Sequence, residues 1–179
     1  MRPSRALVSF AVAIVLGATT GLIGTTIAPT SPIGADRATP GGLEGYPELS
    51  SGSTGDAVTI LQRLLNAEGN AITELGTFGP ETDDAVRMFQ KAKGLKVNGT
   101  IGPAEWGALV PQLRYAETGP RVRALQHALN LRGEELELDG SFGPATLRAV
   151  KATQTKAGIT ANGVAGPDTW RVLVNGTGQ

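Results

Sequence analysis

The chain has 179 residues, with 16 Lys and Arg against 16 Asp and Glu, one histidine and no cysteine. Its formal net charge of zero removes the basic surface that a nucleic-acid-binding protein needs, so no nucleic-acid partner is predicted. The absence of cysteine excludes disulfides, a lipoprotein anchor and any cysteine nucleophile.

The N-terminus has the pattern of an export signal. Arg2 and Arg5 precede an uncharged stretch from Ala6 to Ala28. Because this stretch is also long enough to span a bilayer, residues 1–28 are predicted to be either a cleaved signal peptide or an uncleaved membrane anchor. We expect an extracellular or cell-wall location, with membrane contact only through this segment. Residues 29–48 are rich in Pro, Gly and small polar residues, which predicts a linker.

The rest of the chain is an internal repeat. Phe78 returns as Phe142, 64 positions later, and the other recurring residues are turn glycines, helix-starting prolines and spaced apolar residues. A repeat of this length indicates a duplicated small domain. We predict one domain at residues 49–110 and a second at residues 114–174, each of about 60 residues with a minimal core.

Each repeat is predicted to contain three helices. Apolar residues at helical spacing indicate a first helix at roughly 56–68 and 120–132. Proline suits the first position of a helix, so the remaining helices are expected to begin at Gly79-Pro80, Gly102-Pro103, Gly143-Pro144 and Gly166-Pro167. The fold class that follows is all-α, with two tandem three-helix bundles. A turn phenylalanine and the tryptophan of the third helix close each bundle over its first helix.

Catalytic and metal sites are assessed by the residue types that they need. A zinc hydrolase needs several His or carboxylate ligands, yet His127 is the only histidine. It occupies the position of Arg63 in the first repeat, where we expect a solvated helix residue. We therefore predict no catalytic residue, no metal and no cofactor. Residue counts do not exclude a glycosidase with two carboxylates, but the two repeats leave no room for a further domain.

Three motifs in a fixed order carry a family resemblance. The order is G-x-x-V-x-x-L-Q-x-x-L, then D-G-x-F-G-x-x-T-x-x-A-V-x-x-F-Q, then G-L-x-x-N-G-x-x-G-x-x-T-W-x-x-L, over residues 55–110 and 119–174. This set resembles the three-helix peptidoglycan-binding domain that accompanies bacterial cell-wall hydrolases. The resemblance implies an exported, non-catalytic protein that binds peptidoglycan, with a wall hydrolase as a further candidate partner. The alternatives are a membrane-anchored adaptor for a partner protein and a wall hydrolase.

The candidate ligand surface is the rim formed by the two turns of each repeat, where polar groups lie beside aromatic side chains. The first turn is at residues 76–82 or 139–146, and the second is at residues 98–99 or 162–163. Core packing or turn formation is the alternative role for the aromatic residues and for the asparagines. Four glutamines, Gln62, Gln90, Gln126 and Gln154, are predicted to tie helices to loops. The candidate ligand-binding residues are Phe78, Gly79, Thr82, Asn98 and Trp106 in the first repeat, and Asp139, Gly140, Phe142, Gly143, Thr146, Asn162 and Trp170 in the second.

The repeats depart from the family motif at two positions. Leu75 stands in the first repeat where the second has Asp139. If the carboxylate helps to bind the wall, the first repeat is the weaker ligand site. Thr153 stands in the second repeat where the first has Phe89. If this phenylalanine is a core residue, the second repeat has the weaker core.

Overall fold

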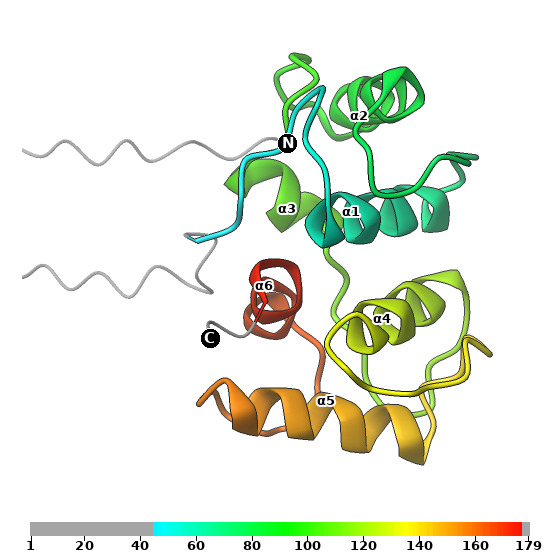
Figure 1. Cartoon of the computed structure of the whole chain (residues 1–179), viewed down its shortest axis with the longest axis vertical. Helices are drawn as coiled ribbons and strands as arrows, with labels where there is room; N and C mark the ends of the chain where they lie inside the picture. The colour runs from blue at the N-terminus through cyan, green and yellow to red at the C-terminus, as the bar shows by residue number, and fades with distance from the viewer. Residues whose placement is uncertain (1–44, 177–179) are drawn as a thin grey trace, which may run out of the picture. The chain divides into compact units, whose positions relative to one another are not determined.

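The computed structural model of the protein describes residues 45–176, and within them the chain is helical. Three helices fall in each repeat, which confirms the all-α class for this part of the chain. The expected export segment and the expected linker up to residue 44 lie outside the described residues. The helices are α1 (Asp56–Ala67), α2 (Pro80–Lys93), α3 (Pro103–Leu109), α4 (Pro120–Asn130), α5 (Pro144–Lys156) and α6 (Pro167–Asn175) (Figure 1).

The helices begin where the glycine–proline pairs indicate. Proline occupies the first position of α2 to α6, where its missing N–H removes no helical hydrogen bond. Helix α1 begins instead at Asp56, whose carboxylate suits the positive end of the helix dipole. Gly94 ends α2 with a positive φ of 67°, a conformation that glycine adopts without strain. None of the helices in this described part combines the length and apolarity that crossing a membrane requires.

A short extended segment precedes the first helix of each repeat and holds the turns of that repeat together. Trp106 Nε1 donates to the carbonyl of Pro47 at 2.9 Å, and Trp170 Nε1 donates to the carbonyl of Pro111 at 2.8 Å. Each proline carbonyl is thus packed with its repeat, and the domain bounds of 49–110 and 114–174 stay a prediction. The segments also form isolated antiparallel bridges, which pair Leu49 with Ile101, Thr54 with Thr77, Leu113 with Ala165 and Thr118 with Ser141.

Tryptophan lies at the centre of each repeat's core. Trp106 and Trp170 are fully buried. Tyr46 stacks on Trp106 with ring centroids 5.4 Å apart, so the end of the expected linker is part of the packed structure. In the second repeat, Thr153 is buried like Phe89 in the first, and a hollow of about 220 Å³ lies beside it. A weaker core in the second repeat stays a prediction at this point.

The two repeats lie in one compact unit and pack through their first helices. Helices α1 and α4 lie side by side (Figure 1). Ile60 and Leu64 of α1 are buried, as are Ala124 and Ala128 at the equivalent positions of α4. These four residues form a second apolar face on each helix, apart from the face that packs into the helix's own repeat. The packing of α1 on α4 accounts for the burial of this second face.

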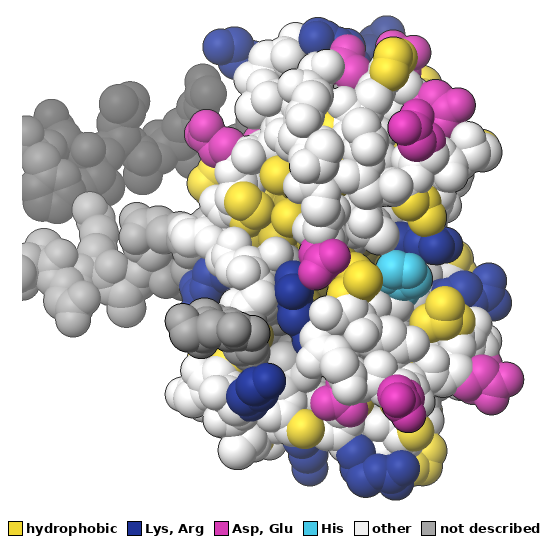
Figure 2. All heavy atoms as spheres, viewed as in Figure 1, with side chains coloured by type: hydrophobic (Ala, Val, Ile, Leu, Met, Phe, Trp, Pro, Cys, Tyr) yellow, Lys and Arg dark blue, Asp and Glu magenta, His cyan; other side chains and the backbone are white. Residues whose placement is uncertain are grey.

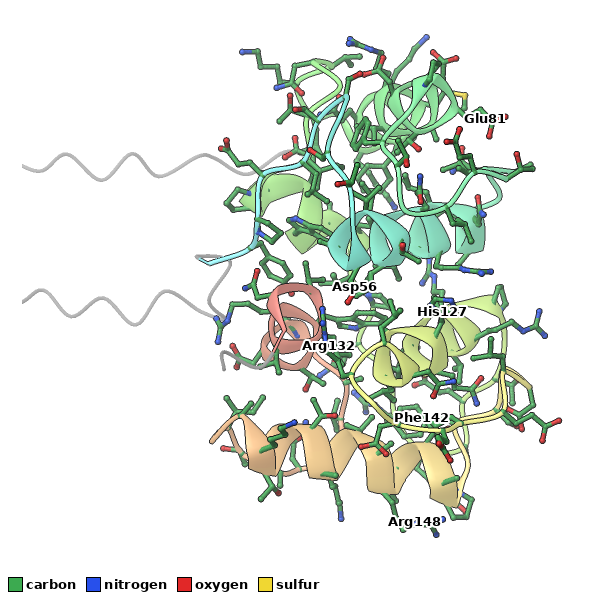
Figure 3. All side chains as sticks on the ribbon, viewed as in Figure 1. Asp56, Glu81, His127, Arg132, Phe142 and Arg148 are labelled. Carbon is green, nitrogen blue, oxygen red and sulfur yellow. The ribbon has the colours of Figure 1, made fainter. Side chains whose placement is uncertain are left out.

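Polar contacts join the repeats at the edge of this interface. Arg132 Nη1 lies 3.1 Å from Asp56 Oδ2, and Arg121 Nη2 lies 2.5 Å from Glu68 Oε1 (Figure 3). The hydroxyl of Tyr46 donates to the carbonyl of Pro167 at 2.7 Å. Burial raises the pKa of this phenol well above its ordinary value, so Tyr46 stays a donor at neutral pH.

Candidate functional site

Seven of the twelve candidate ligand-binding residues are buried, Gly140 and six residues with larger side chains. The side chains of Phe78, Thr82, Trp106, Phe142, Thr146 and Trp170 are between 0% and 2% exposed. Both indole N–H groups donate to proline carbonyls inside the repeat. These buried residues support the turns from beneath, and ligand contact at their positions stays a prediction.

A buried glutamine of α4 holds the first turn of the second repeat, as predicted. Gln126 Nε2 donates to Asp139 Oδ1 at 2.7 Å and to the carbonyl of Ser141 at 3.1 Å. Its Oε1 accepts the backbone N–H of Gly140 at 2.9 Å. The glutamine thus satisfies polar groups of the turn that would otherwise be buried without a partner.

The first repeat holds the equivalent turn without an aspartate. Gln62 Nε2 donates to the carbonyls of Glu74 and Thr77 at 3.0 and 2.8 Å, and its Oε1 accepts the N–H of Gly76 at 2.8 Å. The carbonyl of Glu74 therefore takes the place of the Asp139 carboxylate. Leu75 is compatible with this turn because no side-chain acceptor is needed from it.

Asp139 is exposed, but its Oδ1 atom supports the turn. It accepts from Gln126 and also from the backbone N–H of Ser141 at 2.8 Å. These hydrogen bonds, above all the one from Gln126, hold the pKa of the carboxyl below its ordinary value. Turn geometry accounts for Asp139, and the effect of Leu75 on ligand binding stays a prediction.

The asparagines of the second turn are held in the same manner. Gln154 Nε2 donates to Asn162 Oδ1 at 3.1 Å, and Gln90 Nε2 donates to Asn98 Oδ1 at 2.7 Å. Both asparagines are exposed, and neither side-chain NH₂ group donates to a described residue. The carbonyl oxygen therefore serves the turn, while the NH₂ group can serve a ligand.

The candidate glycines have structural roles. Gly79 and Gly143 precede α2 and α5 in extended conformations that other residues also adopt. Gly140 has a positive φ of 74°, and a Cβ atom there would lie 3.1 Å from the carbonyl oxygen of Gly119. The turn thus requires glycine at position 140 for conformation and for space.

A hollow of about 320 Å³ lies beside the second turn of the second repeat. Of the candidate residues, Asn162 lines it, whereas Asp139, Gly140 and Gly143 do not. The structure therefore does not bring the two turns together at this hollow. Its lining combines the polar residues Gln112, Thr160, Asn162 and Asp168 with the apolar residues Ile159, Val164 and Pro167, a mixture that suits a ligand with both kinds of group.

Apart from Asn162, the residues that line this hollow are absent from the sequence-based candidates, and two of them, Gln112 and Asp168, carry polar side chains on different chain segments. Gln112 lies in the extended segment that enters the second repeat, beside Leu113, whose N–H donates to the carbonyl of Ala165 at 3.1 Å. Asp168 lies in the first turn of α6 and pairs with Arg171 at 3.0 Å. The signal that could have found Gln112 is the sequence Pro-x-Leu, which begins at Pro47 and recurs at Pro111.

His127 is half-buried, in contrast to the solvated position expected from the sequence. Its Nδ1 atom is buried, and burial, followed by the positive charge of Arg63, lowers the pKa of the imidazole. Among residues 45–176, no group of three or more His, Cys, Asp and Glu side chains is placed to hold a metal ion.

The two repeats coincide with two matches to a known family. The family description is "Putative peptidoglycan binding domain", and its matches cover residues 54–109 and 118–173. Among solved structures, the chain is similar to a peptidoglycan-binding protein from Clostridioides difficile in complex with glutamine hydroxamate. The identity is 38%, the match covers 38% of this chain and 43% of the other, and the TM-score is 0.37.

Three curated relatives that are named as enzymes match over less than half of their length. The N-acetylmuramoyl-L-alanine amidase CwlL of Bacillus licheniformis is 31% identical over 156 residues, which cover 68% of this chain and 43% of the relative. The N-acetylmuramoyl-L-alanine amidase CwlM of Mycobacterium tuberculosis is 31% identical over 153 residues, with 70% and 37% covered. The zinc D-Ala-D-Ala carboxypeptidase of Streptomyces albus G is 36% identical over 99 residues, with 48% and 39% covered.

Proposed function

The chain belongs to the family of peptidoglycan-binding domains, with one domain in each repeat, and from this premise we propose that it is an exported, non-catalytic protein that binds cell-wall peptidoglycan. The observation that carries the proposal is the hollow beside Asn162. The three curated relatives described above are named as amidases and a carboxypeptidase, but this chain spans less than half of each. A separate wall hydrolase is the partner that this similarity suggests.

The hollow offers the groups that a glycopeptide needs. The amides of Gln112 and Asn162 and the hydroxyl of Thr160 can exchange hydrogen bonds with sugar hydroxyls or peptide groups. The carboxylate of Asp168 can accept from an N–H donor. Ile159 and the other apolar lining residues can cover the less polar face of a sugar or an alanine side chain.

The first repeat presents different chemistry at the equivalent positions. Glu48 takes the place of Gln112, and Ala104 takes the place of Asp168. We therefore assign the stronger wall contact to the second repeat. Because the two repeats pack against each other, a weaker contact by the first would act at a high effective concentration and could raise the overall affinity by roughly 10² to 10⁴.

The test is sedimentation of the full chain with purified sacculi. The variant is Gln112→Ala/Asp168→Ala, which removes two polar groups from the hollow. We expect its affinity to fall about tenfold or more, or roughly 1.4 kcal/mol. The matched control is Asp84→Ala/Glu135→Ala, which changes two exposed acidic residues elsewhere and should bind like the unaltered chain.

Other results would contradict specific parts of the proposal. Equal binding by the unaltered chain and Gln112→Ala/Asp168→Ala would show that the hollow is not the wall contact. Failure of the unaltered chain to bind sacculi, with recovery of a partner protein, would favour the adaptor. Clearing of peptidoglycan in a zymogram of the purified chain would show that it is a hydrolase.

Wall binding is predicted to be independent of metal ions. The chain has a single histidine and no cysteine, so strong zinc ligands are too few for a zinc site. Sedimentation with sacculi should give the same bound fraction with and without EDTA. Loss of binding in EDTA that calcium or zinc restores would contradict this prediction.

A further inference from the structure

A second hollow, of about 200 Å³, lies between α1 and α4, outside the site proposed above. Its polar lining includes Arg63 from the first repeat and Arg123 and His127 from the second, and Ala124 and Leu138 contribute apolar surface. Positions 63 and 127 are equivalent in the two repeats, so packing the same face of both helices brings them together. Figure 2 shows His127 at the surface with basic side chains beside it, and Figure 3 shows it on the side of α4 that faces α1.

Two nitrogen atoms at this hollow are buried without a partner. Arg63 Nε and His127 Nδ1 are inaccessible to solvent, and neither forms a hydrogen bond with the described residues. A guanidinium N–H can only donate, and a buried donor without an acceptor is unfavourable by about 1–3 kcal/mol. An acceptor that enters the hollow would satisfy Arg63 Nε, and it would satisfy His127 Nδ1 when that nitrogen carries a proton.

The charges around the hollow favour an anion. No Asp or Glu side chain lines it. The nearest acidic groups of the interface already have partners, since Asp56 pairs with Arg132 and Glu68 pairs with Arg121. Arg63 is in none of the ion pairs of the described residues, whereas Arg123 Nε donates to the carbonyl of Leu138 at 3.0 Å.

We propose that this hollow binds a carboxylate, held by Arg63 of one repeat and His127 of the other. A carboxylate offers the planar pair of acceptor oxygens that a guanidinium group recognises. Our identification of the carboxylate rests on the proposed function. A protein that binds peptidoglycan contacts stem peptides, which carry free carboxylates. The site then binds a carboxylate of a stem peptide at a surface that neither repeat forms alone.

His127 is the only histidine in the chain, so its NMR resonances report on this hollow without ambiguity. The pKa of His127 is lowered by burial and by Arg63, while Asp56 opposes this. The other charged groups on α1, α4 and the residues that directly follow them are Glu68, Arg121, Arg123 and Arg132. A bound carboxylate adds a negative charge, so it should raise the pKa of His127 by about half a unit or more.

The experiment titrates His127 by NMR in the full chain with three probes. These are a soluble disaccharide–peptide fragment of peptidoglycan, the same fragment with its carboxylates amidated, and acetate at matched ionic strength. We expect the carboxylate fragment to raise the pKa of His127 and the amidated fragment to leave it unchanged. Arg63→Met should abolish the response, whereas Arg148→Met, on an exposed part of α5, should retain it (Figure 3).

The remaining outcomes separate this inference from the proposed function. An unchanged His127 pKa with every probe, or the same response in Arg63→Met, overturns the carboxylate site, whatever the sacculus assay shows. A response to acetate that equals the response to the fragment supports the carboxylate site and overturns the stem peptide as its source. If Arg63→Met does not fold by circular dichroism, Arg63→Gln, which keeps a polar side chain but removes the charge, supplies the same comparison.

Discussion

Single buried side chains connect distant parts of each repeat. The indole N–H of Trp106 reaches the carbonyl of Pro47, 59 positions earlier, and Tyr46 covers the same ring. Gln126 joins a helix to a turn through a side-chain amide that both donates and accepts. These buried residues support the turns of each repeat from beneath. Substituting them should therefore lower the stability of the protein directly, and should change ligand binding only through the loss of structure.

Replacing Trp106 with alanine should destabilise the protein by about 3–5 kcal/mol, because it leaves a large cavity and removes a buried hydrogen bond. Urea unfolding followed by circular dichroism measures the change. Met88→Ala is the control, since Met88 is 60% exposed and its loss should be nearly neutral. Equal stability of the two variants would show that Trp106 contributes little to the stability of the core.

Replacing Gln126 with leucine should destabilise the protein by about 2–4 kcal/mol, because the N–H of Gly140 loses its acceptor while staying buried. Amide hydrogen exchange at Gly140 should accelerate along with the loss of stability in urea. Gln112→Leu, at an exposed position, is the control for the change in side-chain polarity. Unaltered exchange at Gly140 would show that the glutamine does not hold the turn.

Turns, more than helices, distinguish the two repeats at the scale of the elements. The helices match closely in length because the same glycines and prolines bound them. The first turn instead uses the carbonyl of Glu74 in one repeat and the carboxylate of Asp139 in the other. The exchange is tolerated because a glutamine N–H can donate to a backbone carbonyl oxygen or to a carboxylate oxygen.

Two glycine substitutions separate backbone strain from crowding. Gly140 and Gly158 have similar positive φ values of 74° and 69°, but only at Gly140 would a Cβ atom crowd a carbonyl oxygen, that of Gly119. Gly158→Ala should cost about 1–2 kcal/mol from strain alone. Gly140→Ala should cost about 1 kcal/mol more, because backbone must move to admit the methyl group. Thermal unfolding of both variants decides this, and equal losses would exclude the crowding.

At the scale of the whole molecule, the two repeats share a core-like interface. Ala124 and Ala128 of α4 are buried where α1 packs, and the Asp56–Arg132 pair lies at the edge. The short connection between α3 and α4 keeps the repeats near each other. The second apolar faces of α1 and α4 hold the repeats in contact. The carboxylate hollow exists only because of this packing.

Replacing Ala128 with aspartate should destabilise the protein by about 3–5 kcal/mol, because it places an unpaired charge in the interface. In the unaltered chain, unfolding transitions followed by circular dichroism and by tryptophan fluorescence should coincide. In Ala128→Asp they should separate, because each repeat then unfolds more independently. Ala152→Asp, at an exposed position of α5, is the control, and equal behaviour of the two variants would argue against a shared interface.

The sequence by itself predicts the repeat, the class and the helix boundaries. Proline restricts φ within one residue, and glycine permits positive φ at a single position, so these signals act locally and survive without tertiary context. The pairing of Gln126 and Gln154 with loops was also predictable, because polar residues beside apolar core positions must find partners when buried.

Only the tertiary structure decided which candidate residues reach the surface. Trp106 and Thr146 are buried, and Gln112 and Asp168 line the hollow, because chain segments distant in the sequence fold over or beside them. The position of His127 depends on the other repeat in the same way. Burial is a property of contacts between elements, and helical spacing shows which residues share a face without showing what covers that face.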